Sequence, residues 1–189
     1  MWEVELKAWA DPDLESRLEA IGATLLRREV IEDLYFQHPG RSFAETDEEL
    51  RVRTVDGRAG FITYKGPSTD ATRQTKEELE TPVPDPNAVK AVLRRLGFVD
   101  AIYKCKRCSH WRLDDAILTV GEVEGLGLFV EVEIPTEREE DVATNRARLP
   151  DFLDRIGIPR EKVEIRYFTE MLVEKGLGRP PNLKNRKHP

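Results

Sequence analysis

Charged and apolar residues alternate along five short stretches of the chain, and this alternation is typical of β-strands. In residues 3–7 (EVELK), Glu3, Glu5 and Lys7 fall on one face of the predicted strand, and the two apolar residues between them fall on the other. The same alternation occurs in residues 50–54, 61–65, 76–80 and 130–134. Each stretch therefore predicts a strand with one charged face and one apolar face.

Turn residues between these stretches extend the prediction to about eight strands. The links between strands are short, which favours antiparallel pairing, and DGRA at residues 56–59 predicts a hairpin turn. Residues 38–49 carry several turn residues and predict a loop. The predicted strands cover residues 2–9, 30–37, 50–55, 60–65, 75–83, 101–113, 116–124 and 128–134.

Helices are predicted where a capping residue opens a segment and a glycine closes it. An Asp-Pro pair leads to a glycine at residues 11–22 and again at residues 85–97. A third helix is predicted within residues 137–157, and residues 163–176 begin like a strand and end like a helix. The tail, residues 177–189, is basic and rich in proline, which predicts disorder.

The charged strand faces can be arranged in two ways. Helices need an apolar sheet face to pack against, so the apolar faces can all point outward while the charged faces line a closed barrel. A barrel of about eight strands encloses a lumen wide enough for one small ligand. The alternative is an open sheet whose charged face lies in water. We expect the first arrangement: an α+β fold with an eight-stranded antiparallel barrel or tunnel and helices packed outside.

Composition narrows the classes of function. The 189 residues, 39% of them hydrophobic, suffice for one domain, expected over residues 1–176. The 30 Lys and Arg against 36 Asp and Glu give a net charge of −6, which argues against a nucleic-acid partner but allows one concentrated basic site. The absence of a long apolar run and of a signal peptide predicts a cytoplasmic protein without a membrane partner. The outer apolar face suits helices or a second subunit, which leaves a homodimer open.

Both signs of charge on the same walls indicate the chemistry of the ligand. Several cations that face one lumen suit a polyphosphate, and Arg in particular matches phosphate oxygens in a two-pronged way. Clustered carboxylates suit Mg²⁺ or Mn²⁺, which bind through one or two protein carboxylates together with substrate phosphates. The pattern therefore predicts a polyphosphate bound with a divalent metal.

The two cysteines, Cys105 and Cys108, form a lone CxxC motif. Without a second pair, this motif is a weak signal for zinc or for redox chemistry. The segment also predicts a strand, in which a spacing of three places the two thiols on opposite faces. Free thiols are therefore expected.

An ordered set of motifs covers residues 2–175. It begins with ExExK, at Glu3, Glu5 and Lys7. An Arg-x-Arg pair, the segments ITYKGP and TKEELE, and an ExE pair after a glycine hairpin then supply Arg51, Arg53, Lys65, Lys76, Glu131 and Glu133. This set resembles the CYTH superfamily, also called triphosphate tunnel metalloenzymes, and within it the class IV adenylyl cyclase-like branch.

The resemblance implies a tunnel that binds a triphosphate with Mg²⁺ or Mn²⁺. Lys7 is also a candidate catalytic base if neighbouring cations lower its pKa, or it is a plain phosphate contact. Glu78 and Glu80 share the face of Lys76 and count as further tunnel acids. The implied metal ligands are Glu3, Glu5, Glu131 and Glu133, and the implied phosphate contacts are Lys7, Arg51, Arg53, Lys65, Lys76 and Lys106.

Two positions depart from the family pattern. Cys108 stands where the family usually has Arg, and Gly121 stands where it usually has an Asp of the metal site. Alternation points the neighbouring Glu122 to the other face unless a bulge turns it. His110 and Lys104 share the face of the tunnel lysine of their strand and are candidates to compensate.

Three functions remain open. The resemblance favours a class IV adenylyl cyclase-like conversion of ATP to cyclic AMP and pyrophosphate. The alternative is hydrolysis of thiamine triphosphate or inorganic tripolyphosphate in the same tunnel, since both reactions need the same charges. With Cys108 and Gly121, the protein could instead bind an organic polyphosphate without turning it over.

Overall fold

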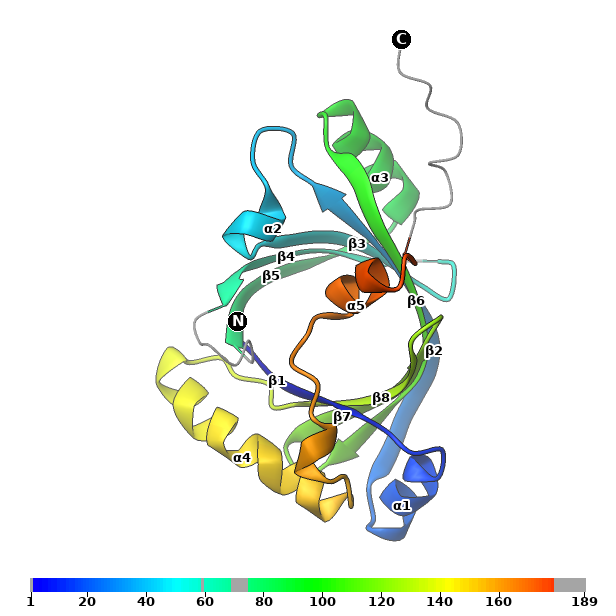
Figure 1. The fold of residues 1–189 in the computed structure, drawn as a ribbon, viewed down its shortest axis with the longest axis vertical. Coiled ribbons are helices and arrows are strands. Elements are labelled where there is room, and N and C mark those ends of the chain that lie inside the picture. The colour runs from blue at the N-terminus through cyan, green and yellow to red at the C-terminus, as the bar shows by residue number, and fades with distance from the viewer. Residues whose placement is uncertain (1, 59, 69–74, 179–189) are drawn as a thin grey trace.

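The computed structural model describes residues 2–58, 60–68 and 75–178, and its strands form a closed antiparallel barrel (Figure 1). The order around the barrel is β1-β5-β4-β3-β2-β6-β7-β8, and β8 pairs with β1 to close it. The predicted fold class is confirmed. The strands are β1 (Trp2–Trp9), β2 (Thr24–Gln37), β3 (Glu49–Val55), β4 (Gly60–Ser68), β5 (Thr75–Val83), β6 (Val99–Leu113), β7 (Ala116–Val123) and β8 (Gly127–Glu133).

Helices cover the outer, apolar face of the barrel. In Figure 1, α4 lies along the side formed by β1, β7 and β8, α1 lies beyond the end of β1 beside β2, and α3 lies at the opposite side beside β3 and β6. Leu18 of α1 and Leu153 of α4 are fully buried there with the outward-facing Val130 and Val132 of β8. The helices are α1 (Leu14–Ala20), α2 (Phe43–Thr46), α3 (Pro86–Arg95), α4 (Val142–Arg155) and α5 (Phe168–Glu174), with short 3₁₀ turns at Glu139–Asp141 and Arg160–Lys162.

Helix α5 packs against one end of the barrel instead of its outer wall (Figure 1). Its Phe168 makes an edge contact with Phe129 of β8 at 4.9 Å between ring centroids, and Trp9 of β1 lies 4.2 Å from the same Phe129 ring. Alternation from Lys7 and Glu131 places Trp9 and Phe129 on the inner face. An apolar cluster therefore lies at this end of the lumen.

Some element boundaries differ from the predictions. Strand β2 begins at Thr24, six residues before the predicted start, because the 15-residue β6 offers backbone partners along its whole length. The predicted loop at residues 38–49 contains α2, whose first turn is capped by the Ser42 side chain. No strand begins at Val163, which makes a single bridge to Ala8.

The predicted disordered tail lies outside the described residues from residue 179 onward. Leu177 and Gly178, which the prediction assigned to the tail, are described and contact the domain. The backbone N–H of Tyr103 donates to the carbonyl of Gly178, at 2.6 Å. Among the described helices, none is both long enough and apolar enough to cross a bilayer.

Candidate functional site

The barrel encloses a cavity of about 490 Å³ whose lining is mainly charged. Every predicted site residue with a described side chain lines this cavity, whereas the Glu3 side chain lies outside the described part of the chain. The structure thus brings together side chains that are up to 128 positions apart in the chain, from Glu5 to Glu133. The predicted residues in the lining are Glu5, Lys7, Arg51, Arg53, Lys65, Lys76, Glu78, Glu80, Lys106, Glu131 and Glu133.

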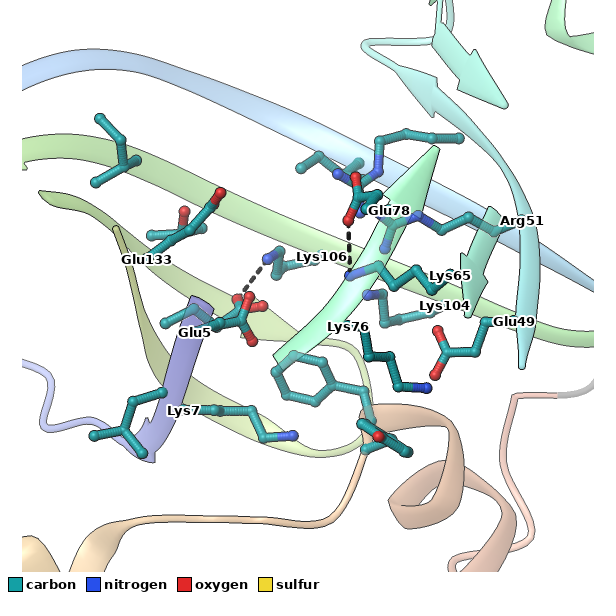
Figure 2. Close-up of a pocket in the computed structure, with 18 of the residues that line it drawn as sticks. Glu5, Lys7, Glu49, Arg51, Lys65, Lys76, Glu78, Lys104, Lys106 and Glu133 are labelled. Atoms are coloured by element: carbon teal, nitrogen blue, oxygen red, sulfur yellow. Dashed lines mark hydrogen bonds and ion pairs between the residues drawn. The ribbon is translucent and has the colours of Figure 1, made fainter. Parts of the chain in front are cut away.

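Carboxylates gather on the wall formed by β1 and β8. Glu5 lies directly opposite Glu133 in the strand register, and Lys7 lies opposite Glu131. Figure 2 shows Glu5 and Glu133 on the same side of the cavity. Side chains directly opposite on antiparallel strands have Cβ atoms about 5 Å apart, so these carboxylates can share one cation. Their oxygen ligands fit Mg²⁺ or Mn²⁺.

Glu131 is held in its ionised form by nearby lysines. Burial alone would raise its pKa, but the charges of Lys106, Lys104 and Lys7 and the hydrogen bond from Lys106 keep the pKa below its ordinary value. The Lys106 Nζ donates to Glu131 at 2.6 Å. The carboxylate is therefore available as an anionic ligand at neutral pH.

Cations occupy the facing wall. In Figure 2, Arg51, Lys65, Lys76 and Lys104 project from β3, β4, β5 and β6 on the side away from Glu5 and Glu133. These side chains are largely withdrawn from solvent; the Lys76 and Lys104 side chains, for example, are each 4% exposed. Buried cations so close together are costly unless anions compensate them. Acids compensate part of this charge, since the Lys65 Nζ lies 3.2 Å from Glu78 and an Arg51 nitrogen lies 3.9 Å from Glu80, but cations outnumber acids among the residues of this wall. The wall is therefore suited to an anionic ligand with several charges.

Asp33 of β2 compensates part of this charge, and the sequence analysis did not select it. It is fully buried and accepts from the Arg53 Nε at 2.7 Å, while the Lys104 Nζ lies 3.0 Å and the Arg51 guanidinium 4.0 Å away. Burial opposes ionisation, but these three cations hold the pKa of Asp33 well below its ordinary value. Asp33 therefore holds the side chains of Arg53, Lys104 and Arg51 in position on the cationic wall.

Other polar residues also line the cavity, and of these the sequence analysis named only Lys104 and His110. Glu49 lies directly opposite Lys65 in the β3–β4 register and two positions before Arg51, so the charged alternation of β3 could have been extended to include it. Lys104, His110 and Arg112 continue the inward alternation of Lys106 along β6, whereas Glu164 lies in an irregular segment where no pattern marks it. The additional polar lining residues include Arg27, Glu49, Lys104, His110, Arg112, Thr119 and Glu164.

Lys7 lies where the cavity meets the apolar cluster of Trp9, Phe129 and Phe168. Its ammonium donates to the backbone carbonyl of Arg166 and lies 4.1 Å from the centroid of the Phe168 ring. Burial lowers the pKa of Lys7, Lys104 lowers it further, and Glu5 and Glu131 oppose the shift. The expected lowering is thus present, but burial contributes more to it than neighbouring cations do.

The two departures from the family pattern face each other. Cys108 of β6 and Gly121 of β7 are direct partners in the strand register. A Cβ atom at Gly121 would lie 2.9 Å from Cδ of Lys106, so the glycine leaves the space that the Lys106 stem occupies. Glu122 is exposed on the outer side, as alternation predicts. Lys104 is bound to Asp33, which leaves His110 as the polar neighbour of Cys108.

Comparison with known proteins decides the family. The model of the CYTH domain matches residues 1–168. This chain belongs to the CYTH domain family. A protein of Methanocaldococcus jannaschii, provisionally named an adenylate cyclase, is 31% identical over 90% of this chain and 98% of its own. Human thiamine-triphosphatase is 29% identical over 73% of each chain. The solved structure of the PH1819 protein from Pyrococcus horikoshii has a TM-score of 0.83 and 34% identity, covering 92% of this chain and 99% of its own.

Proposed function

We propose that this CYTH protein binds a small-molecule triphosphate with Mg²⁺ or Mn²⁺ in the barrel lumen and converts ATP to cyclic AMP and pyrophosphate. The observation that carries the proposal is a partial separation of charge across one cavity of about 490 Å³. Glu5, Glu131 and Glu133 lie on β1 and β8, and cations outnumber the acids Glu49, Glu78 and Glu80 on the facing strands. A triphosphate with a divalent cation presents the complementary charges to both walls.

The proposed roles follow from this separation. Glu5, Glu131 and Glu133 hold the divalent cation, and Glu3 is assigned to the same set from its motif. A bound Mg²⁺ or Mn²⁺ stabilises negative charge that develops on the phosphate oxygens. The phosphate contacts are Arg51, Arg53, Lys65, Lys76 and Lys106, with Lys104 added from the structure.

In the cyclase reaction, the ribose 3′-hydroxyl oxygen forms a bond to the α-phosphorus, and the bond from that phosphorus to the bridging oxygen breaks. Pyrophosphate leaves, and the hydroxyl proton passes to a base. Lys7 is a candidate for this base because its lowered pKa increases the fraction of neutral amine. Its position beside Glu5 and Glu131 also suits a direct phosphate contact.

Two other functions compete with the cyclase. The similarity to human thiamine-triphosphatase supports a hydrolase, in which water attacks the terminal phosphorus and the same walls bind the ligand. The Cys108–Gly121 pair supports binding without turnover, because the family positions for one cation and one acid are both replaced. The M. jannaschii relative, which matches over more of its length, favours the cyclase.

The test is a product assay. The protein is incubated with Mg²⁺ or Mn²⁺ and with ATP, thiamine triphosphate or tripolyphosphate, and cyclic AMP, pyrophosphate and phosphate are measured. We expect cyclic AMP and pyrophosphate in equal amounts from ATP. Phosphate release without cyclic AMP would replace the cyclase with the hydrolase, and tight binding without any product would leave a binding protein.

A pair of lysine variants locates the activity. Lys65→Ala removes a nearly buried cation of the cavity and is expected to lower kcat/KM by about 10-fold to 100-fold, as for loss of one charge-assisted phosphate contact. Lys175→Ala removes an exposed lysine at the end of α5 and serves as the matched control. Equal kinetics for the two variants would place the reaction outside the lumen.

A further inference from the structure

Three different metal-ligating side chains meet in the wall of the barrel, apart from the carboxylates of β1 and β8. Glu29 of β2 lies directly opposite Cys108 of β6, and His110 follows two positions later on the same inner face. The His110 Nε2 lies 2.8 Å from Glu29 Oε1 and 3.4 Å from Cys108 Sγ. Their ligand atoms all lie within 4.8 Å of one another.

We propose that Glu29, Cys108 and His110 bind a divalent transition metal of the zinc type. A thiolate, an imidazole and a carboxylate form the mixed sulfur, nitrogen and oxygen set that Zn²⁺ and Co²⁺ accept, whereas Mg²⁺ prefers oxygen ligands alone. The site would therefore be distinct in chemistry from the carboxylates Glu5, Glu131 and Glu133.

The distances suit a tetrahedral ion after small shifts. Bonds of about 2.3 Å to sulfur and 2.0 Å to nitrogen at the tetrahedral angle place the two ligand atoms about 3.5 Å apart. The Cys108 Sγ and His110 Nε2 are 3.4 Å apart. The shorter His110–Glu29 contact has to lengthen by about 0.5 Å, which a small rotation of the Glu29 carboxylate provides.

Neighbouring groups already orient two of the ligands. The Thr119 hydroxyl lies 3.0 Å from the His110 Nδ1, so this ring nitrogen can carry the proton and donate it while Nε2 faces the cluster. The Arg27 Nε donates to Glu29 Oε2 at 2.8 Å and its Nη2 donates to Oε1 at 3.4 Å, while Oε1 also lies 2.8 Å from the His110 Nε2. Metal-binding histidines are usually held in this way by a hydrogen bond from the other nitrogen.

The charges around the cluster also permit a dication. Lys106, Arg27 and Arg53 are the nearby cations, and each is already paired, Lys106 with Glu131, Arg27 with Glu29 and Arg53 with Asp33. Deprotonation of Cys108 on metal binding adds a second negative charge beside Glu29, which balances the ion. Cys108 and His110 are each 7% exposed, and His110 also lines the cavity, so an ion reaches the cluster from the lumen.

This site differs from the CxxC pair considered in the sequence. Cys105 points to the opposite face of β6 and is directly opposite Glu32, as strand alternation predicts. The side chains that would bind the metal together with Cys108 are Glu29 of β2 and His110 of the same strand, β6. Cys105 therefore provides a matched control, since it is the same residue type on the same strand.

The experiment uses Co²⁺ as a spectroscopic probe on the full chain after treatment with a chelator. In the presence of excess Mg²⁺, we expect one Co²⁺ bound per chain. Its spectrum should show a sulfur-to-cobalt charge-transfer band and visible absorption bands as intense as those of four-coordinate Co²⁺. Cys108→Ser and His110→Gln should lose the charge-transfer band or weaken binding by more than about 100-fold, beyond the 10-fold to 100-fold effect of a supporting residue. Thr119→Val should weaken binding by about 10-fold.

The controls make the proposal falsifiable apart from any catalytic activity. Cys105→Ser should keep the native spectrum and affinity, and circular dichroism with thermal melting establishes that each variant is folded. Absence of a charge-transfer band in the native protein would overturn the site. Equal loss of the band in folded Cys105→Ser and Cys108→Ser would do the same, as would full retention in Cys108→Ser.

Discussion

Replacing Glu131 by Gln is expected to reduce metal-dependent turnover of the triphosphate by about 100-fold or more, since several kcal/mol of transition-state stabilisation depend on the bound cation. The substitution keeps the shape of the side chain but removes its negative charge. It also leaves the Lys106 ammonium, now 2.6 Å from Glu131, without this anionic partner. Initial rates measured over a range of Mg²⁺ and Mn²⁺ concentrations should show a lower kcat and a weaker apparent affinity for the metal ion.

The matched control is Glu122→Gln. It makes the same chemical change one strand away, at an exposed side chain on the outer face of the barrel. Its rates should equal those of the native protein. If Glu131→Gln retained at least half of the native rate with the same dependence on metal concentration, the carboxylates of β1 and β8 would not be the metal site.

Replacing Asp33 by Asn is expected to cost about 3–5 kcal/mol in the free energy of unfolding, because it leaves buried cations without their shared anion. Arg53, Lys104 and Arg51 all lie within 4.0 Å of Asp33. Urea unfolding measures the loss. Tripolyphosphate should raise the melting temperature of the variant more than that of the native protein, since the ligand supplies the missing negative charge.

The pH dependence of the same variant gives a second measurement. Because the pKa of Asp33 is well below its ordinary value in the folded protein, its stabilising contribution is complete above the unfolded pKa near 3.8 and is lost as the pH falls through the folded value. The difference in stability between native protein and Asp33→Asn should therefore shrink in acid. A difference that grows below pH 4 would contradict the assigned ionisation of Asp33.

Asp115→Asn is the control for both measurements. Asp115 accepts two hydrogen bonds from Arg148, at 2.7 and 2.8 Å, but its side chain is 52% exposed. An exposed ion pair contributes about 0–1 kcal/mol, so this variant should remain close to the native stability. A loss as large as that of Asp33→Asn would mean that the effect does not come from burial.

The barrel and most of the candidate site could be predicted because both depend on a period of two. Alternation assigned Glu5, Lys7, Arg51, Lys65 and Glu133 to one face of their strands, and closure of the sheet turned that face inward. The ordered motifs of the family assigned metal and phosphate roles to these residues, which alternation alone does not provide. Local pattern and global fold agree in these strands.

Residues that depend on the pairing of distant strands could not be predicted. Glu32 and Asp33 are adjacent acids, and β2 must be aligned with β3 and β6 before Asp33 can be placed beside Arg53 and Lys104. Glu29 reaches Cys108 across 79 positions of sequence, in a pair of strands whose register shifts near Arg27. Neither contact leaves a local signature.

Helix α5 and the rings of Trp9, Phe129 and Phe168 pack together at one end of the barrel. We expect this packing to obstruct passage, so that a ligand enters and leaves by the opposite end. A site with a single entrance would admit the terminus of a long polyphosphate but would not thread the polymer from one side to the other. Each product should therefore leave before the next substrate molecule can enter.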